Sequence, residues 1–213
     1  MSYKLIIFDL DGTILDTLGD LHEAVNYALK QFHLPLITLE ETKKFIGNGI
    51  RNLLLLASNS NLQIDEILKS FKEYYSKHYN DFTVKYDKIE EVFQYCKDRN
   101  IHIGVFTNKV EDIAQRLVDE HFPNQMEFIY GEVIDRPRKP DPSFLWSILS
   151  QYGYKKEEVL YVGDSEVDVK LCLNAKIDGV FVSYGFRNKE ILSGLTTHIV
   201  DSPLELLKYI GEK

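Results

Sequence analysis

Asp9 and Asp11 stand two positions apart after an apolar run and lead into the turn Gly12-Thr13. A short continuous apolar run is typical of a buried strand in an α/β sheet, and the chemistry of such sheets lies beyond the carboxyl ends of the strands. Because two close carboxylates repel unless they share a cation or a proton, the pair predicts a bound metal ion, a raised pKa, or both. Asp-Gly is also common in ordinary turns, so other parts of the chain must decide.

A second polar strand end is Thr107-Asn108, which follows the apolar pair Val105-Phe106. A hydroxyl and an amide at this position are suitable hydrogen-bond donors for a phosphoryl oxygen. Capping of the next helix by Asn108 explains that residue equally well.

The loop 136–142 is basic within an acidic chain and contains three prolines. Prolines stiffen a loop, so Lys139 can be held in place as a point charge against a phosphate and a carboxylate. A solvated charged loop is the alternative interpretation.

Asp164 and Asp168 follow another apolar run, 159–162, and flank one turn of a predicted helix. Hard oxygen ligands suit Mg²⁺, which takes few carboxylates together with waters and phosphate. N-capping by Asp164 or Ser165 is the alternative. Each alternative is reasonable by itself, but capping explains poorly four strand ends in the order Asp-x-Asp, Thr-Asn, Lys, Asp.

The elements that must position these side chains alternate between helix and strand from about residue 85. We expect helices at 89–97, 110–121, 142–152, 167–174 and 204–210, and strands at 101–107, 128–130, 159–162, 180–183 and 198–200. In the third of these helices, Asp141-Pro142 fits the N-cap and the first helical position. Such alternation predicts an α/β fold with a mostly parallel, Rossmann-like sheet and helices on both faces, to which the first strand belongs.

Residues 16–84 read as helical throughout. Four amphipathic patterns occur, and the last of them runs from Ile64 to His78. Thr38-Leu39-Glu40-Glu41 is a capping-box pattern that opens the second helix, and Gly47-Asn48-Gly49 breaks the chain before the third. We therefore expect residues 1–15 and 85–213 to form the α/β domain, and residues 16–84 to form an inserted four-helix bundle. An insertion just past the carboxylate pair is expected to lie over the active end as a lid.

The composition excludes some classes of protein. The 213 residues are 44% hydrophobic and carry a net charge of −8, which argues against disorder and against binding to nucleic acid or to an anionic membrane. A small anionic substrate stays possible, because a local cation can reverse the field at a site. We expect the two cysteines, Cys96 and Cys172, to be free, buried thiols in a protein of a reducing compartment. With no signal peptide expected before the first strand, and no apolar run long enough to span a membrane, we expect a cytoplasmic protein.

The motifs together resemble a known family. The segment 8–13 (Phe-Asp-Leu-Asp-Gly-Thr), Thr107, Lys139 and Gly163-Asp164 match the four motifs of the haloacid dehalogenase (HAD) superfamily in order. The match extends over essentially the whole chain, and the helical insertion is similar to the superfamily's C1 cap. A second aspartate at position 11 resembles the phosphatases and phosphomutases rather than the dehalogenases.

Two weaker similarities indicate a subgroup among these phosphatases and phosphomutases. The segments 46–51 and 183–186 are similar to those of phosphoglycolate phosphatases. One departure is Lys176, which stands where many relatives carry glycine after Asn-Ala.

The resemblance implies a role for each motif residue. Asp9 would be the nucleophile that forms an aspartyl-phosphate. Asp11 would be the general acid for the leaving alkoxide and then the general base for water. Mg²⁺ would be held by Asp9, by the backbone carbonyl of Asp11 and by Asp164.

The remaining motif residues would support this centre. Thr107 and Asn108 would bind phosphoryl oxygens, and Lys139 would offset charge in the transition state. Asp168 would orient a metal-bound water. Gly12 would permit the turn and Thr13 would anchor it.

The predicted function is a Mg²⁺-dependent phosphatase acting on a small phosphorylated metabolite, with 2-phosphoglycolate as the expected substrate. In the cap, Gly47, Asn48 and Gly49 could approach the substrate through backbone amides, and Arg51 could pair with its carboxylate, although an ordinary exposed arginine is slightly favoured. The alternatives are a sugar phosphate, a nucleotide or pyrophosphate as substrate, a β-phosphoglucomutase-like phosphomutase, or a non-catalytic phosphate-binding protein. The expected oligomeric state is a monomer or a weak dimer.

Overall fold

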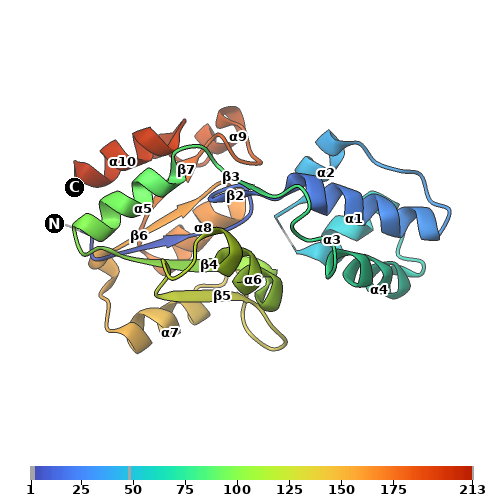
Figure 1. The fold of residues 1–213 in the computed structure, drawn as a ribbon, viewed down its shortest axis with the longest axis horizontal. Helices are drawn as coiled ribbons and strands as arrows, with labels where there is room; N and C mark the ends of the chain where they lie inside the picture. The colour runs from blue at the N-terminus through green and yellow to red at the C-terminus, as the bar shows by residue number, and fades with distance from the viewer. Residues whose placement is uncertain (1–2, 48, 213) are drawn as a thin grey trace. The chain divides into compact units, whose positions relative to one another are not determined.

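The computed structural model of the protein describes residues 3–47 and 49–212. The chain forms two compact units, one made of Met1–Leu15 with Lys85–Lys213 and the other of Asp16–Val84 (Figure 1). It passes from one unit to the other in two short strands, β2 (Leu15–Asp16) and β3 (Val84–Lys85), which pair in a two-stranded sheet of their own. The function of the second unit as a cap stays a prediction.

The first unit contains a six-stranded sheet in the order β5-β4-β1-β6-β7-β8, and its strand pairs are parallel. The strands are β1 (Leu5–Phe8), β4 (His102–Val110), β5 (Phe128–Glu132), β6 (Val159–Gly163), β7 (Asp178–Val182) and β8 (Ile199–Val200). This confirms the predicted parallel α/β sheet. Since β1 lies between β4 and β6, the strand order reverses at β1, where ligand sites of such sheets form.

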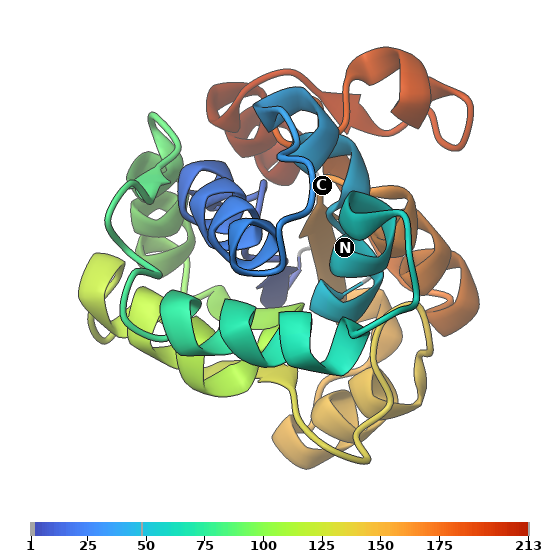
Figure 2. The same cartoon turned by 90° about the vertical axis from the view of Figure 1, so that its right-hand side faces the viewer.

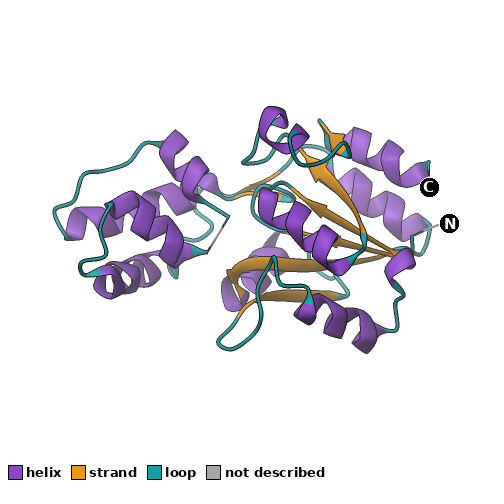
Figure 3. Ribbon diagram, turned by 180° about the vertical axis from the view of Figure 1, so that it is seen from behind, coloured by secondary structure: helices purple, strands orange, loops and turns teal. Residues whose placement is uncertain are grey.

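Helices cover both faces of this sheet (Figure 3). They are α5 (Ile89–Asp98), α6 (Glu111–His121), α7 (Ser143–Tyr152), α8 (Glu166–Ala175), α9 (Lys189–Ser193) and α10 (Pro203–Gly211). Successive side chains of a strand point to opposite faces. Leu5 and Ile7 therefore join one core cluster with residues of α7 and α8, while the Phe8 ring packs edge-on at 5.3 Å against Phe93 of α5. Burial on both faces explains why β1 reads as a continuous apolar run.

The second unit consists of the helices α1 (Leu18–Gln31), α2 (Leu39–Phe45), α3 (Ile50–Ser58) and α4 (Ile64–Tyr75), drawn from blue to teal in Figure 2. The predicted capping box opens α2: Thr38 Oγ1 accepts the Glu41 amide, and the Glu41 carboxylate accepts the Thr38 amide. The stripe expected to continue to His78 ends earlier. His78 lies beyond α4, where it stacks on Tyr74 and pairs with Asp81.

Several predicted boundaries were wrong by a few residues. Strand β4 continues through Asn108 and Lys109 to Val110, so α6 begins at Glu111. Asp141 is not the N-cap of α7; Pro142 is, and the Asp141 carboxylate accepts the Ser143 amide at 2.8 Å. Helix α9 was not predicted, because five residues are too few for a helical period to show.

Cys96 and Cys172 are free and buried, as predicted. Burial raises the pKa of Cys96 to about 12, which keeps its thiol protonated. Among the described residues, no helix combines the length and the apolar character that a membrane span requires.

Candidate active site

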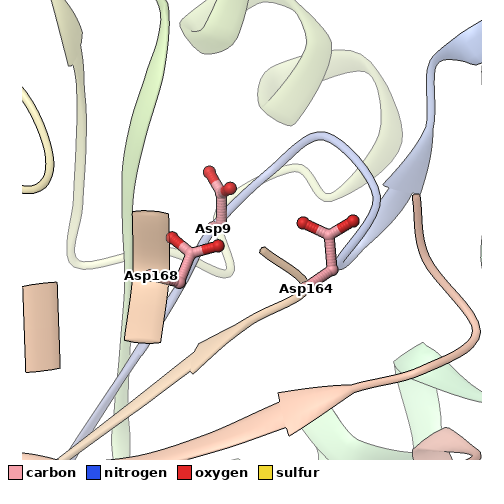
Figure 4. Close-up of side chains that lie close together, drawn as sticks. All are labelled: Asp9, Asp164 and Asp168. Carbon is pink, nitrogen blue, oxygen red and sulfur yellow. The ribbon is translucent and has the colours of Figure 1, made fainter. Parts of the chain in front are cut away.

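Three buried carboxylates meet at the carboxyl-terminal edge of the sheet (Figure 4). Asp9 follows β1 directly, and its amide donates to Val162 O of the neighbouring β6 at 2.8 Å. Asp164 follows β6, and Asp168 lies in the first turn of α8. One oxygen of each carboxylate lies within 4.8 Å of the others. Residues more than 150 positions apart in the chain thus form one acidic cluster.

Gly12 is required by this arrangement for two reasons. Its φ of +79° lies in the left-handed region, which disfavours other residues. A Cβ at this position would also lie 2.2 Å from Asp164 Oδ2. The turn therefore has to pass directly beside the Asp164 carboxylate.

Thr13 contacts the turn through its backbone and not through its side chain. Its Oγ1 is buried and finds no hydrogen-bond partner among the described residues. The backbone of Thr13 holds the turn instead, since its amide donates to Leu10 O at 3.2 Å and its carbonyl accepts the Tyr184 hydroxyl at 3.1 Å.

Lys139 places a positive charge inside the cluster. Its Nζ lies 2.7 Å from Asp168 Oδ1, 2.9 Å from Asp9 Oδ1 and 2.9 Å from the Tyr161 hydroxyl, and the residue is only 4% exposed. Burial alone would lower the pKa of Lys139, but the charges of Asp168 and Asp9 more than offset this, and the pKa lies above its usual value. Lys139 is therefore a buried, charged ammonium group and not part of a solvated loop.

Asp168 has a different set of partners from the one expected. Its Oδ1 accepts from Lys139 Nζ and from the Tyr161 hydroxyl, and its Oδ2 accepts from the amide and the hydroxyl of Ser165. These four bonds occupy both oxygens with protein donors. Asp168 thus holds Lys139 and caps α8, and its expected orientation of a metal-bound water stays a prediction.

Asp164 provides the clearest argument for a cation. Burial, followed by the negative charges of Asp168 and Asp9, raises the pKa of Asp164 well above its usual value. Its Oδ2 accepts the Phe186 amide at 2.6 Å, and no protein group that the structure describes donates to its Oδ1. A divalent cation between Asp164 and Asp9 would relieve this repulsion, so the donor set fits Mg²⁺.

Asp9 shares this environment. Burial raises its pKa to about 6, the nearby Lys139 opposes the shift, and Asp168 adds to it. Its Oδ1 also accepts the amide of Leu10 at 2.8 Å, and Thr107 hydrogen-bonds to the carboxylate. These fixed bonds hold one oxygen of Asp9 in a defined direction.

Asn108 makes a contact that was not predicted, and its expected binding of a phosphoryl oxygen stays a prediction. Its Oδ1 accepts the Lys139 amide at 2.9 Å, and its Nδ2 donates to the Lys139 carbonyl at 3.0 Å. The side chain thus fixes the backbone of the loop that carries Lys139. Thr107 is buried and hydrogen-bonds to Asp9, and its expected contact with a phosphoryl oxygen stays a prediction.

Lys109 was not predicted from the sequence as a site residue. Its Nζ lies 2.9 Å and 3.3 Å from the two carboxylate oxygens of Asp11. A lysine two positions after Thr107 shares the face of Thr107 in an extended strand, and this spacing was the signal that could have found it. The side chain of Asp11 is not part of the acidic cluster formed by Asp9, Asp164 and Asp168; the expected contact of Asp11 with a metal, through its backbone carbonyl, stays a prediction.

The candidate residues of the helical unit are described separately. Gly47 and Gly49 both have positive φ, and Gly49 is the N-cap of α3. Asn48 lies outside the described residues. Arg51 pairs with Asp65 at an exposed position, which agrees with the interpretation of Arg51 as an ordinary surface arginine.

This geometry brings three buried carboxylates and a buried ammonium group together in one place. Phosphoryl transfer needs little else, because it depends on positioning and on stabilising the charge of the transferred group. Comparisons with known proteins agree. The family model for haloacid dehalogenase-like hydrolases matches residues 6–182. The chain belongs to the haloacid dehalogenase-like hydrolase family.

Relatives within the HAD family are named phosphatases. A phosphoglycolate phosphatase from Pseudomonas syringae pv. tomato is 32% identical over 87% of this chain and 71% of its own length. One from Aliivibrio fischeri is 28% identical over 96% of this chain and 94% of its own. A crystal structure from Lactobacillus delbrueckii subsp. bulgaricus, whose name as a phosphoglycolate phosphatase is itself an inference, matches with a TM-score of 0.92 at 30% identity over 99% of both chains. The protein is thus a HAD phosphatase, a phosphoric monoester hydrolase.

Proposed function

We propose that this HAD phosphatase hydrolyses 2-phosphoglycolate, using Mg²⁺ and an aspartyl-phosphate intermediate. The observation that supports the proposed chemistry is the convergence of Asp9, Asp164 and Lys139 in one buried cluster at the strand ends. A cluster that only bound phosphate would not need a carboxylate beside the anion, because two negative groups repel. A nucleophile does need to be there.

In the proposed first step, Asp9 attacks phosphorus while the bond to the leaving oxygen breaks. The proton for that oxygen comes from the carboxyl group of Asp11. In the second step, Asp11 takes a proton from water as the water oxygen bonds to phosphorus, and the bond between phosphorus and Asp9 breaks, which releases phosphate and restores the Asp9 carboxylate. Lys139 stays charged in its buried position and offsets the negative charge that builds up on the phosphoryl group. Asp168 and Tyr161 hold the Lys139 ammonium group in place.

The cation site adds one further contribution. Asp9, Asp164 and the backbone carbonyl of Asp11 would hold Mg²⁺, which supplies Lewis-acid stabilisation of the phosphoryl oxygens and screens Asp9 from them. The inserted unit, residues 16–84, is proposed to serve as the cap that selects the substrate.

The choice of 2-phosphoglycolate rests on the names of the relatives. It is tested by phosphate release from a panel that contains 2-phosphoglycolate, sugar phosphates, nucleotides and pyrophosphate, with and without EDTA. We expect the highest kcat/KM for 2-phosphoglycolate and loss of activity in EDTA. If another ester ranks far above it, the substrate is wrong while the chemistry stands.

The nucleophile is tested with Asp9→Asn, which keeps the size of the side chain and removes its charge. We expect no turnover, with unchanged secondary structure by circular dichroism. Asp119→Asn is the matched control, because Asp119 is exposed on α6, and its turnover should equal that of the wild type. Acid quenching of the wild type during turnover should trap an acyl-phosphate that Asp9→Asn lacks. Steady turnover by Asp9→Asn would refute the assignment.

A further inference from the structure

Lys109 contacts Asp11, the proposed general acid, but has no role of its own in the steps described above. The Lys109 side chain is 3% exposed, and its Nζ contacts both oxygens of Asp11, at 2.9 Å and 3.3 Å. A buried ammonium group is costly to desolvate unless a carboxylate and hydrogen bonds compensate for it. An ordinary surface ion pair would not be enclosed in this way.

The backbone explains how Lys109 reaches this position. The pairing of β4 with β5 shifts register between Phe106 and Val110, so this end of β4 is irregular. The Lys109 amide donates to Thr107 Oγ1 at 3.3 Å, and both side chains are buried. Asn108, between them, pairs with the backbone of Lys139. Three consecutive residues therefore contact three parts of the site: Thr107 contacts Asp9, Asn108 contacts the backbone of Lys139, and Lys109 contacts Asp11.

Lys109 and Lys139 hold different carboxylates. Lys139 contacts Asp9 and Asp168, whereas Lys109 contacts Asp11. The turn that carries Asp11 is fixed by backbone hydrogen bonds to Leu10 O, but these bonds do not determine the direction of the Asp11 side chain. That direction is determined by the contact of Lys109 Nζ with both carboxylate oxygens of Asp11.

We propose that Lys109 is a positioning residue that holds the Asp11 carboxyl group for proton transfer to the leaving oxygen. The inference rests on the proposed role of Asp11. In that step the bond between phosphorus and the leaving oxygen breaks, a bond between Asp9 and phosphorus forms, and the proton moves from Asp11 to the leaving oxygen. Asp11 is left as a carboxylate, whose charge the Lys109 ammonium group balances.

Two substrates separate this role from a general structural one. p-Nitrophenolate leaves without needing a proton, whereas the alkoxide of 2-phosphoglycolate needs one. A misplaced acid therefore lowers kcat/KM for the alkyl ester far more than for the aryl ester. For Lys109→Met we expect a loss of about 10²-fold with 2-phosphoglycolate, the size typical of a displaced catalytic group, and a loss below about fivefold with p-nitrophenyl phosphate.

Companion variants make the test specific. Lys109→Arg, which keeps the charge, should recover part of the loss on the alkyl ester, and Lys170→Met, at an exposed position on α8, should leave both substrates unchanged. If Lys109→Met does not fold, as judged by circular dichroism, Lys109→Gln takes its place with the same expected difference between substrates. Equal losses on both substrates would make Lys109 a phosphate ligand or a structural residue and overturn the proposal.

Asp11→Asn distinguishes failure of this proposal from failure of the proposed function. It should show the same difference between the two substrates, and adding Lys109→Met to it should cost nothing further, because Lys109 acts through Asp11. If Asp11→Asn loses both substrates equally, the assigned role of Asp11 is wrong. If only Asp11→Asn shows the difference and Lys109→Met does not, the role of Asp11 stands and that of Lys109 falls.

Discussion

Replacing Lys139 by methionine should damage stability and catalysis for separate reasons. The Lys139 ammonium group lies within 3 Å of both Asp9 and Asp168, and all three residues are buried. Without it, two carboxylates face each other with no cation from the protein. Removing one partner of a buried ion pair costs about 3–5 kcal/mol. At roughly 2–4 °C per kcal/mol for a chain of this size, the melting temperature in EDTA should fall by about 6–20 °C.

The double variant Lys139→Met/Asp168→Asn separates the two effects. Asp168→Asn removes one of the two carboxylates that have lost their ammonium partner, and with it the repulsion that Asp168 exerts on Asp9. We therefore expect the double variant to regain roughly half of the lost free energy of unfolding. Its kcat should stay about 10²–10³-fold below the wild type, as in the single variant, because the charge that stabilises the transition state is still missing.

The assay combines calorimetric melting in EDTA with phosphate release in Mg²⁺, and Lys170→Met serves as the control for loss of an exposed lysine. A double variant as unstable as Lys139→Met would show that unpaired carboxylates are not the cause of the instability. Return of activity in the double variant would show that Lys139 only supports the fold.

Two further predictions concern the metal site and the backbone. Because burial raises the pKa of Asp9 to about 6, above the value of about 4 in an unfolded chain, the metal-free protein should lose up to about 3 kcal/mol of stability as the pH rises from about 4 through 6. Comparison with the melting of Asp9→Asn in EDTA isolates this contribution, and equal pH dependence in the two proteins would contradict it. Lys176 ends α8 at φ +57°, so Lys176→Gly should gain about 1 kcal/mol, raising the melting temperature by about 2–4 °C. Lys170→Gly within the same helix should lose about as much, and a loss in both variants would refute the strain at Lys176.

Local sequence was sufficient wherever the physical signal is local. The apolar run of β1 predicts a strand buried on both faces, and Thr38-x-x-Glu41 predicts the start of α2, because a capping box involves only neighbouring residues. The alternation of helix and strand after residue 85 predicts the parallel sheet, because a helix between two strands carries the chain back to the edge where the first strand began, so that the two strands run in the same direction. The short helix α9 and the exact start of α7 were beyond this reasoning.

The site could be predicted only in part. Asp9 and Asp164 were recognised because both follow buried strands, whose carboxyl ends meet in space. The hydrogen-bond partners of each side chain were not predictable, because a shift of the backbone by a fraction of an ångström decides whether a hydrogen bond forms. The contacts of Asn108 with the backbone of Lys139 and of Asp168 with the Lys139 ammonium group are examples.

The sequence by itself determined the fold class, the family and the identity of the groups able to do chemistry, because these depend on residue type, spacing and order. The tertiary structure decided which charges meet. It placed Lys139 between Asp9 and Asp168, and Lys109 against Asp11. Which of these two lysines, thirty positions apart, contacts which carboxylate follows from the path of β4 and of the loop after β5. No pattern along the chain encodes the distance between an ammonium group and a carboxylate.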